Sequence, residues 1–169
     1  LVLLQHDSDP FSRWEAGQRL ALNRLLAATR GDGGLTLDDA FLTAMRQTLR
    51  HPTLDAAFKD LLLTPPSEAY VAEKLTVVDP QRIHSAREAM RVQLAAALRD
   101  DWAWAYEQHQ IAGAYTPDPV SAGKRSLANL ALSMLCLDAV TQGDAVWPGR
   151  AYQRFKDAAH MTDRLGALA

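Results

Sequence analysis

The residues with the greatest potential for chemistry lie in the stretch HDSDPFSRWEA, residues 6–16. The stretch combines acidic, basic and aromatic side chains at close spacing, namely His6, Asp7, Asp9, Arg13, Trp14 and Glu15. Imidazole and carboxylate groups of this kind can bind a metal ion, act as a general acid and base, or cap the charged start of a helix. The rest of the chain has to decide among these three possibilities.

The histidine spacing argues against a metal site. A zinc peptidase site has the form H-E-x-x-H, in which two histidines share a helical face and the glutamate activates water. That pattern does not occur, and the histidines are widely separated, at positions 6, 51, 84, 109 and 160. His84 and Glu88 are one helical turn apart, and we interpret them as a surface contact. We therefore expect no catalytic, cofactor-binding or metal-binding residue in this chain.

Other catalytic patterns are also missing. Asp38-Asp39 and Asp100-Asp101 are adjacent in predicted helices, where neighbouring side chains point about 100° apart, so we expect solvated carboxylates rather than an acid/base pair. The segment GDGG at residues 31–34 lacks the lysine and the strand of a phosphate-binding loop. No nucleophile elbow occurs. Trp102, Trp104 and Tyr106 have no interleaved basic residues, which favours packing over a nucleic-acid platform.

Composition limits the class of protein. The chain has 169 residues, 48% hydrophobic and 22% charged, which is enough for one domain with a substantial core. Its net charge of −2, with dispersed Lys and Arg, argues against nucleic acid as a partner. No segment approaches the roughly 18 apolar residues of a membrane span. Cys136, the single cysteine, excludes an internal disulfide, and its apolar neighbours predict a buried thiol in a reducing, cytoplasmic location.

Helix signals recur along the whole chain, whereas strand signals are almost absent after the first residues. Asp-Pro pairs at residues 9–10 and 79–80 are typical of helix starts. The predicted helices span residues 10–30, 37–50, 53–63, 68–75, 80 to about 112, 121–140 and 151–159, and a last helix begins at Thr162 and Asp163. Phe11 and Trp14 lie on the apolar face of the first helix, Thr36 forms a capping box before the second, and Ser67 precedes the fourth. The helix from residue 80 is predicted to be the longest and uninterrupted, and a turn at 147–149 is predicted before the helix at 151–159. Successive helices with short connections predict an all-α fold, a right-handed α-α superhelix of the armadillo/HEAT kind.

Four stretches, in order, resemble the aminopeptidase N family of zinc metallopeptidases, most closely its bacterial members. These are HDSDPFSRWEA, TPPSEAYVAEKLTVVDPQRIHSAREAM, GKRSLANLAL with the pattern Lys-Arg-x-Leu-x-Asn, and HMTDRLGAL. The resemblance spans residues 6–168 and implies the first part of the C-terminal helical domain. Residues 1–8 would then be the junction with a remnant of a β-sandwich strand at Leu1 to Leu4. Residues 9–169 would be a helical domain whose last helices are missing.

The resemblance implies a parent enzyme that removes N-terminal amino acids from peptides with one zinc ion. Neither its H-E-x-x-H motif nor its Gly-x-Met-Glu-Asn motif occurs here, and the chain has no initiator methionine, so we expect a noncatalytic piece that is inactive alone. Its partners would be the catalytic and β-sandwich domains of the same polypeptide. Peptides would be the substrates of the parent enzyme. In this setting Asp7, Ser8 and Asp9 cap the first helix and tie down the turn. Trp14 would bury its ring, and Arg13 or Glu15 would pair locally or across the boundary. The alternative is an independent helical-repeat module that binds peptides or proteins.

Overall fold

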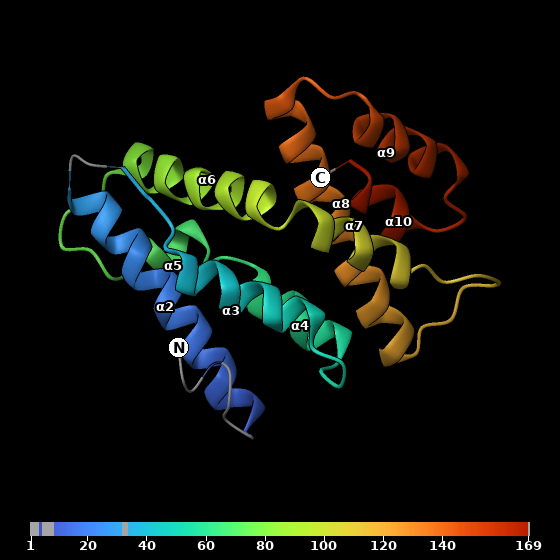
Figure 1. Cartoon of the computed structure of the whole chain (residues 1–169), viewed down its shortest axis with the longest axis horizontal. Coiled ribbons are helices and arrows are strands. Elements are labelled where there is room, and N and C mark those ends of the chain that lie inside the picture. The colour runs from blue at the N-terminus through green and yellow to red at the C-terminus, as the bar shows by residue number, and fades with distance from the viewer. Residues whose placement is uncertain (1–3, 5–8, 32–33, 169) are drawn as a thin grey trace.

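The structure is a computed structural model that describes residues 4, 9–31 and 34–168. Within this part of the chain every regular element is a helix (Figure 1). The all-α prediction is therefore confirmed for the described residues. The helices are α2 (Pro10–Arg30), α3 (Asp39–Arg50), α4 (Ala56–Leu63), α5 (Glu68–Ala72), α6 (Pro80–Ala97), α7 (Arg99–Gln108), α8 (Pro119–Gln142), α9 (Val146–Asp157) and α10 (Met161–Gly166).

The helices are arranged as a layered stack around α8. Figure 1 shows α2 to α6 on one side of the molecule and α8 to α10 on the other, with α7 continuing beyond a bend after α6. The long helix α8 packs against α4, α6 and α7 on one side and against α9 and α10 on the other. It therefore joins the two halves of the stack.

Aspartate caps begin the three longest helices. Asp9, Asp79 and Asp118 each precede a proline, and each carboxylate accepts a hydrogen bond from the backbone amide three residues later. Proline suits the first helical position because its missing N–H would have no partner inside the helix. The sequence predicted the first two starts correctly, but it placed the third at Ser121, two residues after the observed Pro119.

Three other predicted boundaries are corrected by the structure. Asp38, rather than Thr36, caps α3, because its Oδ1 accepts the Phe41 amide at 2.8 Å. The predicted turn at residues 147–149 lies within the first turn of α9. The break before α9 occurs instead at Gly143, whose φ of +70° is a left-handed conformation that glycine adopts without strain.

The predicted uninterrupted helix from Pro80 is wrong, since it bends at Leu98 and becomes α6 and α7. Side chains satisfy the backbone carbonyls at the bend. Trp102 Nε1 donates to the carbonyl of Leu94 at 3.1 Å, and Arg46 Nη2 donates to the carbonyl of Ala97 at 2.9 Å. Because Arg46 belongs to α3, a tertiary contact stabilises this bend.

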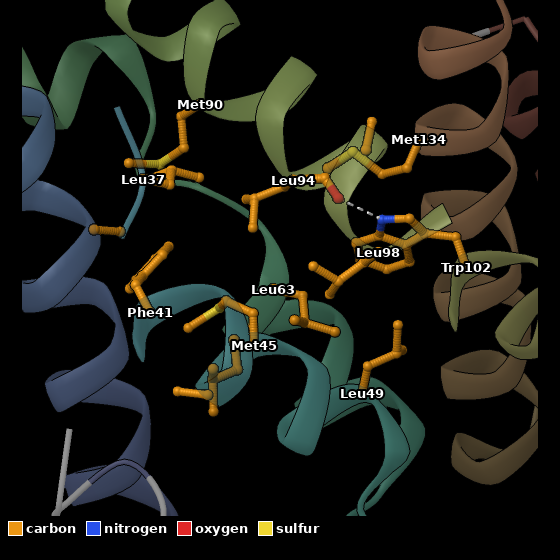
Figure 2. Close-up of a cluster of buried hydrophobic side chains, with 14 of the residues drawn as sticks. Leu37, Phe41, Met45, Leu49, Leu63, Met90, Leu94, Leu98, Trp102 and Met134 are labelled. Atoms are coloured by element: carbon orange, nitrogen blue, oxygen red, sulfur yellow. Dashed lines mark hydrogen bonds between the residues drawn. The ribbon is translucent and has the colours of Figure 1, made fainter. Parts of the chain in front are cut away.

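The hydrophobic core runs through the interface between the two halves of the stack. Figure 2 shows apolar side chains from α3, α4, α6, α7 and α8 pointing toward one another around Trp102, whose side chain is completely buried. The labelled members of this cluster are Leu37, Phe41, Met45, Leu49, Leu63, Met90, Leu94, Leu98, Trp102 and Met134. The core is thus continuous across the bend, which makes α6 and α7 parts of one packed unit.

Candidate functional site

The amino-terminal junction is a structural element in the residues that are described. Asp9 is exposed and caps α2, accepting hydrogen bonds from the amide of Ser12 at 2.9 Å and from its hydroxyl at 2.7 Å. The Ser12 hydroxyl is the larger cause that lowers the pKa of the Asp9 carboxyl, followed by the Ser12 amide. The prediction that Asp9 caps a helix is confirmed. His6, Asp7 and Ser8 lie outside the described residues, so their predicted roles remain predictions.

Arg13 fastens the start of α2 to the preceding chain. Its Nε donates to the carbonyl of Leu4 at 3.0 Å, and both residues are buried. At Gly17, a β-carbon would lie 3.2 Å from a methyl of Leu62 and 3.3 Å from a methyl of Leu4, so glycine permits this close packing. Arg13 therefore pairs locally, one of the two predicted arrangements. Leu4, the one described residue of the expected strand remnant, is helical rather than extended.

The aromatic residues of the junction are less buried than predicted. Phe11 was expected on the apolar face, yet 66% of it is exposed. Trp14 is only partly buried, and its ring lies 6.0 Å from that of Phe11. Glu15 is exposed. The interior of the first turns is occupied by Arg13 and Gly17 instead, which leaves the two rings at the surface.

Other polar residues differ from the sequence interpretation. Asp101 was expected to be solvated, but it is buried and accepts hydrogen bonds from Arg46 Nε at 2.9 Å and Arg50 Nε at 2.7 Å. His84 does not pair with Glu88; its Nδ1 lies 2.9 Å from Glu68 Oε1. Partner choice across helices depends on tertiary packing, which sequence spacing alone does not contain.

Two further residues from the sequence analysis, Glu88 in α6 and Cys136 in α8, also differ from what was expected. Glu88, in α6, is held instead by Arg91 Nη1 at 2.9 Å. Cys136, in α8, was expected to be buried but is only partly so, and burial raises the pKa of its thiol. A thiol with a raised pKa is a weak nucleophile at neutral pH, so Cys136 has the properties of a packing residue.

A basic groove is a cavity that the sequence analysis did not anticipate. It has a volume of about 460 Å³ and lies where the loop after α3, the start of α4, the end of α7 and the start of α8 meet. Its chemically active lining residues are Arg50, His51, Lys59, Trp104, His109 and Lys124. We use the name basic groove for this cavity below.

Lys59 is the central charge of the basic groove. Only 4% of the residue is exposed, and burial lowers the pKa of its ammonium, an effect that the Asp55 carboxylate partly opposes. Burial lowers the pKa of His51, and the charges of Arg13 and Lys59 add to this. The pKa of His109 is lowered mainly by burial and also by Lys59 and Lys124, against a hydrogen bond to the Ala105 carbonyl. Both imidazoles are thus held toward the neutral form, chiefly by burial and also by the neighbouring positive charges.

A polar cluster beside the middle of α8 contains residues from two of the stretches that carried the family resemblance. Asn129, the asparagine of GKRSLANLAL, accepts from Arg154 Nη2 at 3.1 Å, and its amide donates to the Thr162 carbonyl at 3.4 Å. Arg154 Nη2 also donates to Asp163 Oδ1 at 3.0 Å. The Lys-Arg-x-Leu-x-Asn and Met-Thr-Asp stretches therefore join α8, α9 and α10. The sequence analysis missed Arg154, which looks like an ordinary surface cation in AYQRFKDAA.

Two further observations bear on the class of protein. Within residues 4, 9–31 and 34–168 no group of three or more His, Cys, Asp or Glu side chains is placed to hold a metal ion. Among the described helices, none combines the length and apolar character that crossing a membrane requires.

The stack around α8 and its continuous core define an armadillo-type α-α superhelix, as the sequence predicted. A family model described as "Domain of unknown function (DUF3458_C) ARM repeats" matches residues 1–169, and the chain belongs to this family.

Relatives of known name are aminopeptidases. Aminopeptidase N of Caulobacter vibrioides is 34% identical over 167 residues, which is 99% of this chain and 19% of that protein. The aminopeptidases N of Escherichia coli and Haemophilus influenzae are 31% and 30% identical, again over 19% of their lengths. The crystal structure of Legionella pneumophila aminopeptidase A in complex with aspartic acid shares the fold, with a TM-score of 0.82 and 22% identity over 99% of this chain and 20% of that one. The predicted resemblance to the helical domain of aminopeptidase N is confirmed, and the chain spans 19% of these relatives.

Proposed function

We propose that this chain is the helical domain of a larger zinc-dependent aminopeptidase that removes N-terminal amino acids from peptides. The observation that carries the proposal is the alignment of nearly the whole chain with 19% of each of three aminopeptidases N. Its partners are then the catalytic and β-sandwich domains of the same polypeptide, and peptides are the substrates of the parent. The single cysteine agrees with a reducing, cytoplasmic location.

The zinc ion belongs to the catalytic domain in this proposal. The described residues of this chain do not fit a zinc site, because their His, Cys, Asp and Glu side chains form no group that could hold a metal. The sequence also lacks H-E-x-x-H. In this proposal the described residues of the chain take no part in metal binding or water activation, and the role of the domain is structural.

The role we assign to the domain is to enclose the active site and restrict access to short peptides and flexible ends. A wall of this kind has to be rigid, since a mobile wall would admit larger substrates. Rigidity is supported by the core that continues across the bend at Leu98 and by the Arg154 cluster that joins α8, α9 and α10. The core connects helices that are distant in sequence, and the Arg154 cluster ties the last three helices to one another.

The first test is the sequence upstream of Leu1 in the gene. An H-E-x-x-H helix in the same reading frame is expected; a start codon immediately before Leu1 would favour the independent repeat module instead. The role as a wall is tested in the parent protein by placing a specific protease site before Asp9 and cleaving after folding. After cleavage the helical domain can separate from the rest of the parent. The ratio of two turnover rates, for a small aminoacyl reporter and for a folded protein with the same N-terminal residue, should then decrease. Unchanged discrimination after separation of the domain would contradict the enclosing role.

A further inference from the structure

The basic groove contains the ammonium of a mostly buried lysine, and no described group within 4 Å pairs with it. Lys59 lies in α4, and only 4% of the whole residue is exposed. Among the described residues its ammonium has no hydrogen bond or ion pair within 4 Å, and its nitrogen is not fully buried, so the ammonium faces the groove. The nearest compensating features are the Trp104 ring, whose centroid lies 5.9 Å away, and the field of Asp55. An ammonium that faces the groove without an acceptor from the described residues is free to bind an anion that enters it.

The Asp55 carboxylate does not form an ion pair with Lys59, because it caps α4. Its Oδ1 is the cap of α4 and accepts the amides of Ala57 at 2.8 Å and Phe58 at 3.2 Å. Moving the carboxylate toward Lys59 would leave those amides without partners. The ammonium therefore remains available to a carboxylate from outside the described chain.

The other charges around the groove have the same sign. Arg50 stacks on the Trp104 ring at 4.3 Å, and the exposed Lys124 approaches from α8. Arg50 is partly neutralised by Asp101, but Asp101 is shared with Arg46. Because two arginines share one carboxylate, a net positive charge remains beside Lys59. The surroundings of Lys59 consequently attract an anion.

The remaining walls of the groove are apolar and aromatic. Pro52, Leu54 and Val120 line it together with the indole of Trp104. A small hydrated anion such as phosphate would make no use of these surfaces. A carboxylate attached to a peptide with an apolar neighbour would place its charge at Lys59 and its side chain on the walls.

We propose that the basic groove binds a carboxylate carried by a peptide next to an apolar residue, with Lys59 as the principal cation and Trp104 as the apolar wall. The choice of a peptide rests on the proposed function, because peptides are the substrates of the proposed parent. The choice of a carboxylate rests on the charges and burial of the groove alone. Binding to this chain requires no catalytic domain, so it is measured independently of aminopeptidase activity.

The test is a calorimetric titration of the 169-residue chain with blocked tripeptides. Acetyl-Leu-Glu-Leu-amide carries a side-chain carboxylate, acetyl-Leu-Gln-Leu with a free C-terminus carries a terminal one, and acetyl-Leu-Gln-Leu-amide carries none. Binding of either of the first two at least tenfold more tightly than the third supports the proposal and identifies the source of the carboxylate. Equal affinity of all three peptides would overturn it.

Variants connect the binding to Lys59. Lys59→Met keeps much of the side-chain volume and removes the charge, and it should weaken binding of the acidic peptide at least tenfold. Lys156→Met, an exposed lysine of α9, changes the net charge equally and should leave binding unchanged. If Lys59→Met lowers the melting temperature too far, Lys124→Gln on the surface should still weaken binding several-fold. Full affinity in a folded Lys59→Met or in Lys124→Gln would overturn the proposal.

Inorganic phosphate separates a peptide site from a general anion site. Phosphate should displace the acidic peptide only at concentrations well above those at which the peptide itself binds. Displacement at equal concentrations would overturn the assignment to a peptide. If the peptide binds as expected but the parent protein lacks aminopeptidase activity, the groove proposal holds and the proposed function is wrong. If the parent is an active aminopeptidase but the groove does not bind the peptide, the proposed function holds and the groove proposal is wrong.

Discussion

Gly123→Ala should weaken the packing between α4 and α8. A β-carbon at Gly123 would lie 2.8 Å from the backbone nitrogen of Ala57, 3.0 Å from its β-carbon and 3.3 Å from its α-carbon. The obstructing atoms are the backbone of α4, which cannot rotate away as the end of a side chain could. The two helices would have to separate.

The expected loss of stability combines two opposing effects. Overpacking a close contact costs about 1 to 3 kcal/mol, and the upper part of that range applies because the contact is with backbone. Alanine recovers about 1 kcal/mol through its higher helix propensity. The net destabilisation should therefore be about 1 to 2 kcal/mol, which lowers the melting temperature by about 2 to 8 °C for a domain of this size.

Urea unfolding followed by circular dichroism measures the change in the free energy of unfolding. Gly149→Ala is the matched control, because Gly149 is also in a first helical turn and nothing lies within 4 Å of a β-carbon there. The control should be neutral or stabilised by up to about 1 kcal/mol. If Gly123→Ala is as stable as Gly149→Ala, the close approach of α4 and α8 is wrong.

Further predictions concern charge, acidity and metal. Asp101→Asn should destabilise the fold by about 1 to 3 kcal/mol, the range for hydrogen bonds to charged groups, and Arg46→Gln should then cost less than in the wild type, as a double-mutant cycle would reveal. The pKa of Asp118 is lowered to about 2, chiefly by the Ser121 amide, so its charge stabilises the fold above its usual pKa near 3.8 and this contribution disappears as the pH falls toward 2. Asp118→Asn should remove that pH dependence in acid unfolding curves, with the two curves converging below pH about 2. The purified chain should bind no stoichiometric zinc after dialysis and should not hydrolyse aminoacyl reporters; activity that follows the protein through repurification would contradict this.

The helix starts could be predicted because their signals are local. Asp9-Pro10 and Asp79-Pro80 combine a side-chain acceptor with a fixed φ, and the structure places both where the sequence did. The bend at Leu98 could not be predicted, because no glycine or proline marks it. Its carbonyls are satisfied by the Trp102 indole and by Arg46, which lies 51 residues before Ala97. Local sequence contains no record of a partner at that distance.

The candidate functional residues also fall into two groups, those that local sequence predicts and those that depend on tertiary packing. The capping role of Asp9 followed from its position before a proline, but the exposure of Phe11 did not, because helical periodicity alone does not tell which apolar residues the neighbouring helices cover. The basic groove was missed because its charges come from four separate segments. Lys59 in particular lies in an apolar stretch, FKDLLL, where a lysine normally extends to solvent. Its burial is a property of the packed helices.

The contact between Arg46 and the bend also has a consequence for the order of folding. Without α3 in place, the bend keeps only its local contact, the Trp102 indole on the Leu94 carbonyl, so residues 80–108 should first form one nearly continuous rod. Docking of α3 supplies the donor for the Ala97 carbonyl and the two arginines for Asp101, and the rod can then bend. The amino-terminal half should therefore consolidate before α7 reaches its final direction. Substitutions of Arg46 should slow refolding more than they accelerate unfolding.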